Sequence, residues 1–257
     1  MRGFILTGLI MSLLTACAPS SHSGHPNDSP SIVHGRAVTA DNSLSHSVVA
    51  LVMRSPQGES LCTGSIINDS TILTAGHCLD GQADQVLIVF ATSVDRATED
   101  LTRRGVRFVL HPSWKRGSGN RADLGVIKFS GGLPAGFVPV QLGHFSPTPN
   151  SLVTLAGYGV RSGVSHAGAG ILRQTKTQIL TPTTKTELIT DDRKQGSCFG
   201  DSGGPAFVEG PGGRIQIGVT SRGLNSTCTK ASIHTLVGPF LPWINRVKQM
   251  NLPNDKG

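Results

Sequence analysis

The chain has 257 residues, of which 37% are hydrophobic and 15% are charged, with 32 glycines and 15 prolines. This composition argues against a coiled coil, a helical bundle or a mainly disordered chain, and the length suits one large all-β domain or two smaller ones. The formal net charge of +7 comes from scattered Lys and Arg, and only one Tyr and two Trp are available to stack on bases. These features argue against nucleic-acid binding and favour an ordinary basic surface.

The first seventeen residues have the pattern of an export signal. Arg2 supplies a positive charge, residues 3–13 form a short apolar stretch, and small residues precede Cys17. This stretch is too short to span a membrane stably, and no apolar run near 18 residues follows it. The segment resembles a bacterial lipoprotein signal, in which the cysteine becomes the lipidated first residue; the alternative is an ordinary signal peptide with a chance cysteine. Residues 18–31, rich in Ser, Pro, His and Gly, are expected to form a flexible tether or a propeptide.

Four cysteines remain if Cys17 carries lipid, namely Cys62, Cys78, Cys198 and Cys228. An even set in an exported protein predicts two disulfides, but four cysteines allow three pairings and their spacing does not choose among them. No pair has Cys-x-x-Cys spacing, so neither a zinc site nor a redox site is expected. We expect no metal and no cofactor.

From Ile32 onward, short β-branched or aromatic runs alternate with Gly, Pro, Asp and Ser turns. The predicted strands, in chain order, are 48–52, 85–90, 106–110, 124–129, 152–155, 205–208 and 215–219. Such spacing favours a sandwich or a barrel over βαβ units. The Gly- and Pro-rich stretch 131–149 is the predicted boundary between two sets of strands, and residues 239–250 show apolar helical spacing that predicts a terminal helix.

Three short motifs carry residues suited to one chemistry. His77 follows a β-type run, Asp123 begins an apolar run, and Ser202 lies in the glycine-rich turn Gly200–Pro205. A serine hydroxyl needs an imidazole to take its proton, and the imidazole needs a carboxylate to orient it. Glycines let backbone N–H groups turn toward a developing oxyanion. Each residue alone has an ordinary structural explanation, but together they predict a nucleophilic serine.

These motifs resemble those of the chymotrypsin-like (trypsin-family) serine proteases over residues 32–250. Further matching segments are Leu61–Ile67, Gly157–Gly159, Thr220–Gly223 and Leu241–Ile244. The resemblance implies an all-β fold of two antiparallel six-stranded β-barrels with a C-terminal α-helix. The first barrel would cover about 32–135, the second about 146–238, and the helix about 239–250.

The resemblance also implies a role for each residue of the site. His77 would be the general base, Asp123 its orienting carboxylate and Ser202 the nucleophile. The backbone N–H groups of Gly200 and Ser202 would form the oxyanion hole, and Ser221 would add a hydrogen bond to Asp123. The implied disulfides are Cys62 with Cys78 and Cys198 with Cys228.

The specificity pocket, which binds the residue before the scissile bond (P1), is assigned in the same way. Gly196 falls where trypsin-like enzymes carry an aspartate, Ser197 and Gly223 would line the walls, and Ser232 would lie near the base. The resulting uncharged slot predicts cleavage after apolar residues. His234 is expected to pack behind the pocket, the alternative being a ligand for an acidic P1 residue. Arg222 replaces the family's usual tryptophan beside the substrate strand.

Ile32–Gly35 resembles the new N-terminus of the family's zymogens. After cleavage before Ile32, the freed ammonium would pair with the buried Asp201 and order the turn at Ser202. The alternative is that Asp201 only hydrogen-bonds its own turn and the uncut chain is active. Ser31 suits neither a trypsin-like activator nor an apolar pocket, so a separate activating protease is expected.

The sequence therefore predicts an exported, monomeric serine endopeptidase that acts on protein or peptide substrates through an acyl-enzyme. It would bind no nucleic acid and would contact the membrane only through the lipid on Cys17. One alternative is a catalytically weak or inactive binding protein on the same fold, although such proteins normally lack a triad residue. Another is a basic surface protein that binds anionic polymers.

Overall fold

The computed structural model describes residues 32–56, 58–81, 84–117, 122–146, 148–182 and 184–252. The predicted signal segment, Cys17, the tether and Ser31 lie outside the described residues. In the described part of the chain, no helix is long and apolar enough to cross a membrane.

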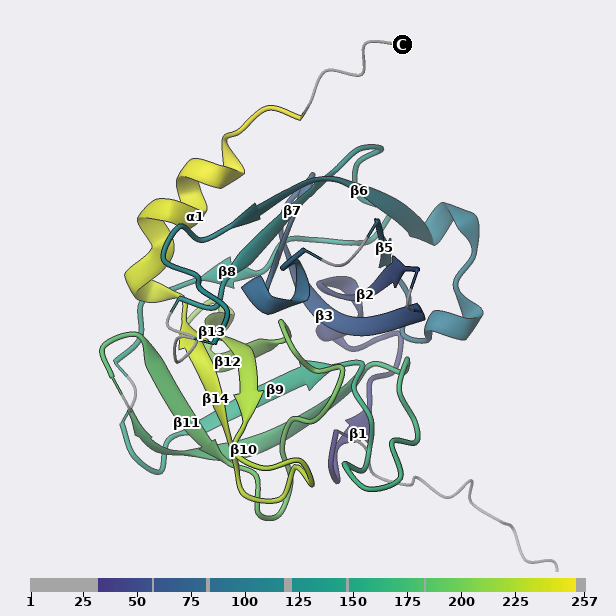
Figure 1. Cartoon of the computed structure of the whole chain (residues 1–257). Helices are drawn as coiled ribbons and strands as arrows, with labels where there is room; N and C mark the ends of the chain where they lie inside the picture. Colours follow the sequence, from purple (N-terminus) through teal and green to yellow (C-terminus); the bar gives the residue numbers. More distant parts are fainter. Residues whose placement is uncertain are drawn as a thin grey trace, which may run out of the picture.

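The first barrel is a closed ring of six antiparallel strands in the order β2-β3-β4-β7-β6-β5 (Figure 1). The strands are β2 (Val48–Ser55), β3 (Gly58–Asn68), β4 (Thr71–Thr74), β5 (Gln85–Val89), β6 (Thr102–Leu110) and β7 (Gly125–Phe129). Its interior is filled by aliphatic and phenyl side chains, including Leu51, Ile66, Ile72, Phe90 and Phe129. Alternation of inward apolar and outward residues along the strands produces this core.

The second barrel also closes, because β10 pairs with β9 as well as with β11. Its strands are β9 (Leu152–Gly157), β10 (Arg173–Pro182), β11 (Glu187–Asp191), β12 (Pro205–Gly210), β13 (Gly213–Gly223) and β14 (Ala231–Leu236). Two short strands join from outside the ring: β1 (Arg36–Ala37) pairs with β10, and β8 (Gln141–Leu142) pairs in parallel with β13. The double-barrel fold expected from the sequence is thus confirmed.

The N-terminal segment departs from the expected division of the chain. Residues 32–135 were expected to belong to the first barrel, yet β1 lies in the sheet of the second barrel, with Arg36 opposite Gln174. Val33 forms a further bridge to Gly196. Backbone pairing with β10 holds this segment beside the loop that begins at Gly196.

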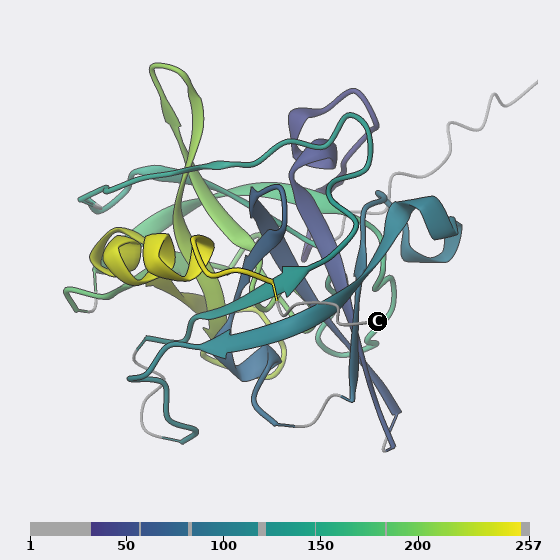
Figure 2. The same ribbon diagram turned by 90° about the horizontal axis from the view of Figure 1, so that it is seen from above.

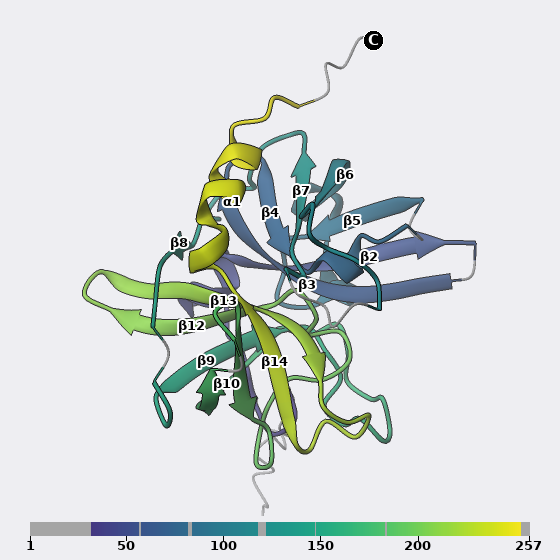
Figure 3. The same ribbon diagram turned by 60° about the vertical axis from the view of Figure 1, so that its left-hand side comes forward.

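The described helices are short and connect or cap the barrels. They are η1 (Ser43–His46), η2 (Gly76–Cys78), η3 (Val94–Arg96), η4 (Glu99–Leu101), η5 (Gly238–Phe240) and α1 (Leu241–Lys248). The predicted terminal helix 239–250 is therefore a 3₁₀ turn followed by eight α-helical residues. Figures 2 and 3 show α1 on the outside of the molecule, where Ile244 and Val247 join the core of the first barrel. The Lys128 ammonium donates to Thr71 Oγ1 (2.9 Å) and to the carbonyl of Lys248 (3.0 Å), which ties the helix end to β4 and β7.

Tyr158 joins the two barrels directly behind the glycine turn that ends β9. Its ring is fully buried, and its hydroxyl lies 3.1 Å from the carbonyl oxygen of Val48 and 2.7 Å from that of Ala91. Burial raises the pKa of this phenol far above its ordinary value. The neutral hydroxyl therefore serves as a donor to the first barrel, and it fixes the turn Gly157–Gly159 against the site described below.

Candidate active site

The pairing of β4 with β7 brings His77 to Asp123. Thr74 at the end of β4 lies opposite Gly125 at the start of β7. The segment after β4 and the segment before β7 therefore emerge at the same edge of the barrel. His77 lies in η2, three residues beyond Thr74, and Asp123 lies two residues before Gly125. Strand pairing alone thus places side chains that are 46 residues apart in contact.

The Asp123 carboxylate is fully buried and receives three hydrogen bonds. Oδ1 accepts the backbone N–H of His77 (2.9 Å), and Oδ2 accepts both Nδ1 of His77 (2.8 Å) and Oγ of Ser221 (2.6 Å). An ionised carboxylate only accepts, so the contact with Asp123 places a proton on Nδ1 of His77 and turns Nε2 away from the carboxylate. The imidazole is 32% exposed, and its Nε2 lies 3.9 Å from Cys78 Sγ at the cavity that Ser202 also lines.

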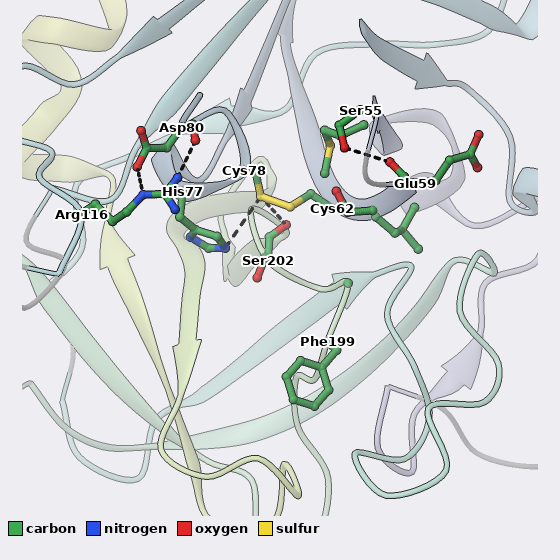
Figure 4. A pocket seen from close by; sticks show the side chains of 14 residues that line it. Ser55, Glu59, Cys62, His77, Cys78, Asp80, Arg116, Phe199 and Ser202 are labelled. Atoms are coloured by element: carbon green, nitrogen blue, oxygen red, sulfur yellow. Dashed lines mark hydrogen bonds and ion pairs between the residues drawn. A yellow bond between two sulfur atoms is a disulfide. The ribbon is translucent and has the colours of Figure 1, made fainter. Parts of the chain in front are cut away.

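Ser202 lies in the turn before β12 and lines the same cavity as His77 (Figure 4). The cavity measures about 510 Å³ and is bounded by the β2–β3 hairpin, the Cys62–Cys78 disulfide and Phe199. Between these two described residues there is no Ser202 Oγ to His77 Nε2 hydrogen bond. Catalytic contacts of this kind commonly shorten only when substrate binds. The arrangement places a serine hydroxyl and an oriented imidazole on one cavity.

The backbone N–H groups of Gly200 and Ser202, two residues that line this cavity, have no acceptor in the described part of the chain. The carbonyl of Phe199 accepts from Val160 N–H, and that of Asp201 accepts from Gly204 N–H, both at 2.8 Å. In a trans peptide the N–H of the next residue points the opposite way. The N–H groups of Gly200 and Ser202 therefore point away from these contacts, and neither donates to any described part of the chain. The φ of +94° at Gly200, which favours glycine, makes this geometry accessible.

Asp201 is a second buried carboxylate, directly before the serine. It is 1% exposed, and its oxygens accept the backbone N–H groups of Gly159 and Cys198, each at 2.8 Å. Burial raises the pKa of Asp201 to about 7, and no described cation lies within ion-pair distance. Ile32 is also fully buried, at φ +45°. No described hydrogen bond or ion pair joins Ile32 to Asp201 in the uncut chain.

A second cavity, of about 320 Å³, opens beside Ser202. The expected pocket residues Ser197, Gly223 and Ser232 all line it, together with Arg222. Arg222 pairs with the buried Glu187 at 2.9 Å, so the cation that replaces the family's tryptophan is partly neutralised. Gly196 lies behind this wall and is not one of the lining residues.

His234 does not reach the cavity. It is fully buried, with Nε2 2.9 Å from Thr190 Oγ1 and Nδ1 3.2 Å from Thr220 Oγ1. Burial lowers the pKa of His234 to about 3, so the ring is neutral. The histidine packs behind the cavity and is therefore not a ligand for a P1 side chain, which leaves Arg222, paired with Glu187, as the cation among the lining residues.

One residue near the cavity, Asp192, was not predicted from the sequence as part of the site. The carboxylate is 1% exposed and lies against Gly196, in the space where a side chain of residue 196 would begin. Its hydrogen-bond donors are Thr190 Oγ1 (3.1 Å) and Ser232 Oγ. An aspartate four residues before Gly196 was the available signal, but nothing local indicates that its side chain folds back onto the glycine.

Both disulfides implied by the family resemblance are present. Cys62 pairs with Cys78, which ties η2 to β3, and Cys198 pairs with Cys228, which ties the loop before Ser202 to the loop before β14. Cys62, His77 and Cys78 have potential metal ligands within 4.8 Å of one another. Because both sulfurs are bonded to each other, this cluster cannot supply the thiolates that a metal site needs.

Comparison with known proteins agrees with the fold. The family model described as Trypsin matches residues 32–244. Brachyurin of Leptuca pugilator is 30% identical over 199 residues, covering 71% of this chain and 85% of the relative. Chymotrypsin of Phaedon cochleariae is 25% identical over 235 residues, covering 83% of this chain and 80% of the relative.

A solved structure titled HL collagenase superposes with a TM-score of 0.71 at 21% identity, covering 85% of this chain and 99% of that one. At this identity the likeness concerns the fold alone. The family of the chain is established by the family model and by the relatives. The chain belongs to the trypsin family.

Proposed function

We propose that this chain is a serine endopeptidase that cleaves peptide bonds through an acyl-enzyme on Ser202. The observation that carries the proposal is the buried Asp123 carboxylate, which holds Nδ1 of His77 and leaves Nε2 facing the cavity lined by Ser202. Family membership supports the same activity. Chymotrypsin and cathepsin G of Mus musculus, which is 26% identical over 223 residues and covered to 80%, are relatives that support a protease.

In the proposed reaction, Ser202 Oγ attacks the substrate carbonyl while Nε2 of His77 takes its proton. The N–H groups of Gly200 and Ser202 stabilise the oxyanion, and Asp123 stabilises the cationic imidazole. His77 then gives the proton to the leaving amine as the C–N bond breaks. Water attacks the ester by the same route and regenerates the serine hydroxyl.

A fluorophosphonate label tests the proposal. The wild-type chain should be labelled on Ser202 and should hydrolyse peptides, whereas Ser202→Ala should lose label and turnover, and His77→Ala should lose nearly all turnover. Ser65→Ala is a matched control, because its hydroxyl is buried without a hydrogen-bond partner in the described part of the chain. An unlabelled, inactive wild-type protein would favour a non-enzymatic binding protein on the protease fold. Salt-sensitive polymer binding that is independent of Ser202 would favour the basic surface protein.

The proposal extends to export and activation. We propose lipidation at Cys17, to be checked by mass spectrometry of the membrane fraction, with Cys17→Ser expected to leave the protein unanchored. Two disulfides agree with an exported chain. Cleavage before Ile32 by a separate protease would supply an ammonium for the unpaired Asp201 and would release the domain from its tether.

The preference for an apolar P1 residue was predicted from Gly196 alone. The predicted pocket residues Ser197, Gly223 and Ser232 are uncharged, but the cation Arg222 also lines the cavity. The carboxylate behind Gly196 argues for a different substrate class.

A further inference from the structure

Two neighbouring aspartates at the end of β11 have opposite environments. Asp191 faces outward and forms an ion pair with Arg193 at 2.6 Å. Asp192 turns inward and is 1% exposed. The backbone N–H of Asp192 donates to the carbonyl of Lys230 at 3.1 Å, which anchors it beside β14. The inward carboxylate is thus fixed by the sheet of the second barrel.

The carboxylate of Asp192 takes the place of a side chain at residue 196. A Cβ atom built on Gly196 would lie 2.1 Å from Cγ and 2.3 Å from Oδ1 of Asp192, which is closer than real Cβ atoms approach other atoms. Residue 196 must therefore be glycine for Asp192 to fit. This is also the position at which the sequence resemblance places the aspartate of trypsin-like enzymes. The acidic group missing from residue 196 is supplied by residue 192.

Two serine hydroxyls connect Asp192 to the cavity. Ser197 Oγ donates to Ser232 Oγ at 2.8 Å, and Ser232 Oγ donates to the carboxylate of Asp192. Both serines line the cavity beside Ser202. Because an ionised carboxylate only accepts, both hydroxyl protons point toward Asp192. The oxygen lone pairs that remain make the floor of the cavity an acceptor surface, which suits an ammonium or guanidinium group because these groups only donate.

The charge of Asp192 has no cationic partner within ion-pair distance among the described residues. Asp191 and Asp201, which interact with it electrostatically, are also acidic, and Arg222, the cation that lines the cavity, is paired with Glu187. Burial raises the pKa of Asp192 to about 6, so the group is ionised at weakly alkaline pH. An uncompensated buried charge is costly, and a cation bound in the cavity would offset that cost.

We propose that Asp192, acting through Ser232 and Ser197, makes the cavity beside Ser202 a site for cationic P1 side chains, Lys or Arg. This inference rests on the proposed peptidase activity and replaces the apolar preference expected from Gly196. Asp192 does not line the cavity itself, so it acts as a specificity-determining residue through the two hydroxyls.

The first test compares two peptides that differ only in P1, lysine against norleucine, which has the same carbon chain without the ammonium. At pH 8 the wild-type protein should have at least tenfold higher kcat/KM for the lysine peptide. Asp192→Asn should reduce this ratio at least tenfold, and the control Asp191→Asn, with the same charge change on the surface, should leave it unchanged. Preference of the wild type for norleucine, or an unchanged ratio in Asp192→Asn, would overturn the inference.

Moving the carboxylate distinguishes its charge from a merely structural role. The double variant Asp192→Ala with Gly196→Asp returns an acid to the same space from the neighbouring backbone position. It should restore the lysine-to-norleucine ratio to within threefold of wild type, even if Asp192→Asn folds poorly. A folded double variant, labelled by fluorophosphonate but lacking lysine preference, would contradict the proposed charge effect.

A binding experiment separates this inference from the proposed activity. The Ser202→Ala protein should bind p-aminobenzamidine, a flat aromatic cation, in a calorimeter, and adding Asp192→Asn should weaken binding at least tenfold. Benzyl alcohol, an uncharged ring, should show no such difference. If the wild type fails to turn over any peptide but this binding pattern holds, the proposed activity fails and the cation site stands. If the protein hydrolyses peptides but does not bind p-aminobenzamidine, the inferred cation site is wrong and the proposed activity stands.

Discussion

The hydroxyl of Ser221 lies 2.6 Å from Oδ2 of Asp123, the same carboxylate oxygen that accepts the Nδ1 proton of His77. Ser221 belongs to β13 of the second barrel, whereas His77 and Asp123 belong to the first barrel. The orientation of the imidazole therefore depends on how the two barrels pack together. We therefore expect Ser221 to act as a positioning residue in the proposed reaction.

Ser221→Ala should lower kcat by roughly tenfold with little change in KM. A hydrogen bond to a charged group contributes about 1.5–3 kcal/mol, and only the part that changes as the imidazole becomes cationic affects the rate. Steady-state kinetics would separate kcat from KM. Ser65→Ala serves as the control, and equal kcat in the two variants would argue that Ser221 has no part in orienting Asp123.

The lysine-to-norleucine ratio should depend on pH. Asp192, with a pKa of about 6, is faced by Thr190 and Asp191 from its own segment, Ser197 from the pocket loop, Ser232 from β14, and the charge of Asp201. The ratio should be constant above about pH 7 and should fall as the pH drops below 6, because protonation removes the charge that binds lysine. The ratio of the two kcat/KM values cancels the titration of enzyme groups, such as Asp201, that affect both substrates equally. A flat ratio between pH 5 and 8 would contradict this prediction.

Protein that starts at Ile32 should be at least tenfold more active than an uncleavable longer form. The freed ammonium would pair with Asp201, and cleavage would also release Ile32 from its φ of +45°, a conformation costly for a β-branched residue. Asp201→Asn should remove most of the gain, and Asp191→Asn should not. Peptide hydrolysis by the purified forms provides the measurement. If the form that starts at Ile32 and the longer form are equally active, Asp201 only hydrogen-bonds to its own turn.

Neutral His234 should make the protein acid-sensitive. The pKa of this histidine is about 3 when buried, compared with an ordinary value of 6.5, so its contribution to stability is complete above pH 6.5 and declines as the pH falls toward 3. The free energy of unfolding of the wild type relative to His234→Gln should therefore decrease by about 1.4 kcal/mol per pH unit in that range. Asp192 and Asp201, whose pKa values are raised, change stability in the opposite direction, falling as the pH rises through about 6 to 7. Urea unfolding of both proteins isolates His234, since the aspartates are common to the two, and a difference that does not vary with pH would contradict the prediction.

Much of the fold was predictable because strand and turn signals are local. The seven predicted strands lie in β2, β5, β6, β7, β9, β12 and β13, with ends within a few residues of those observed. Several other strands were missed, among them β10 and β11, since Arg173–Pro182 is rich in polar residues and Glu187–Asp191 is short. Their strand character comes from pairing with β9 and β14, and such pairing depends on distant parts of the chain.

The candidate triad was also readable from the sequence, because His77, Asp123 and Ser202 each lie in a short motif whose residue types fit one chemistry. The charge behind the pocket was not readable in this way. Gly196 by itself indicates an uncharged slot, and only the folded chain brings the carboxylate of Asp192 into the space that the glycine leaves open. Ser232, which joins that carboxylate to the cavity, lies 40 residues further along the chain. A turn depends on a few consecutive residues, whereas the electrostatics of a buried pocket depend on every segment that packs around it.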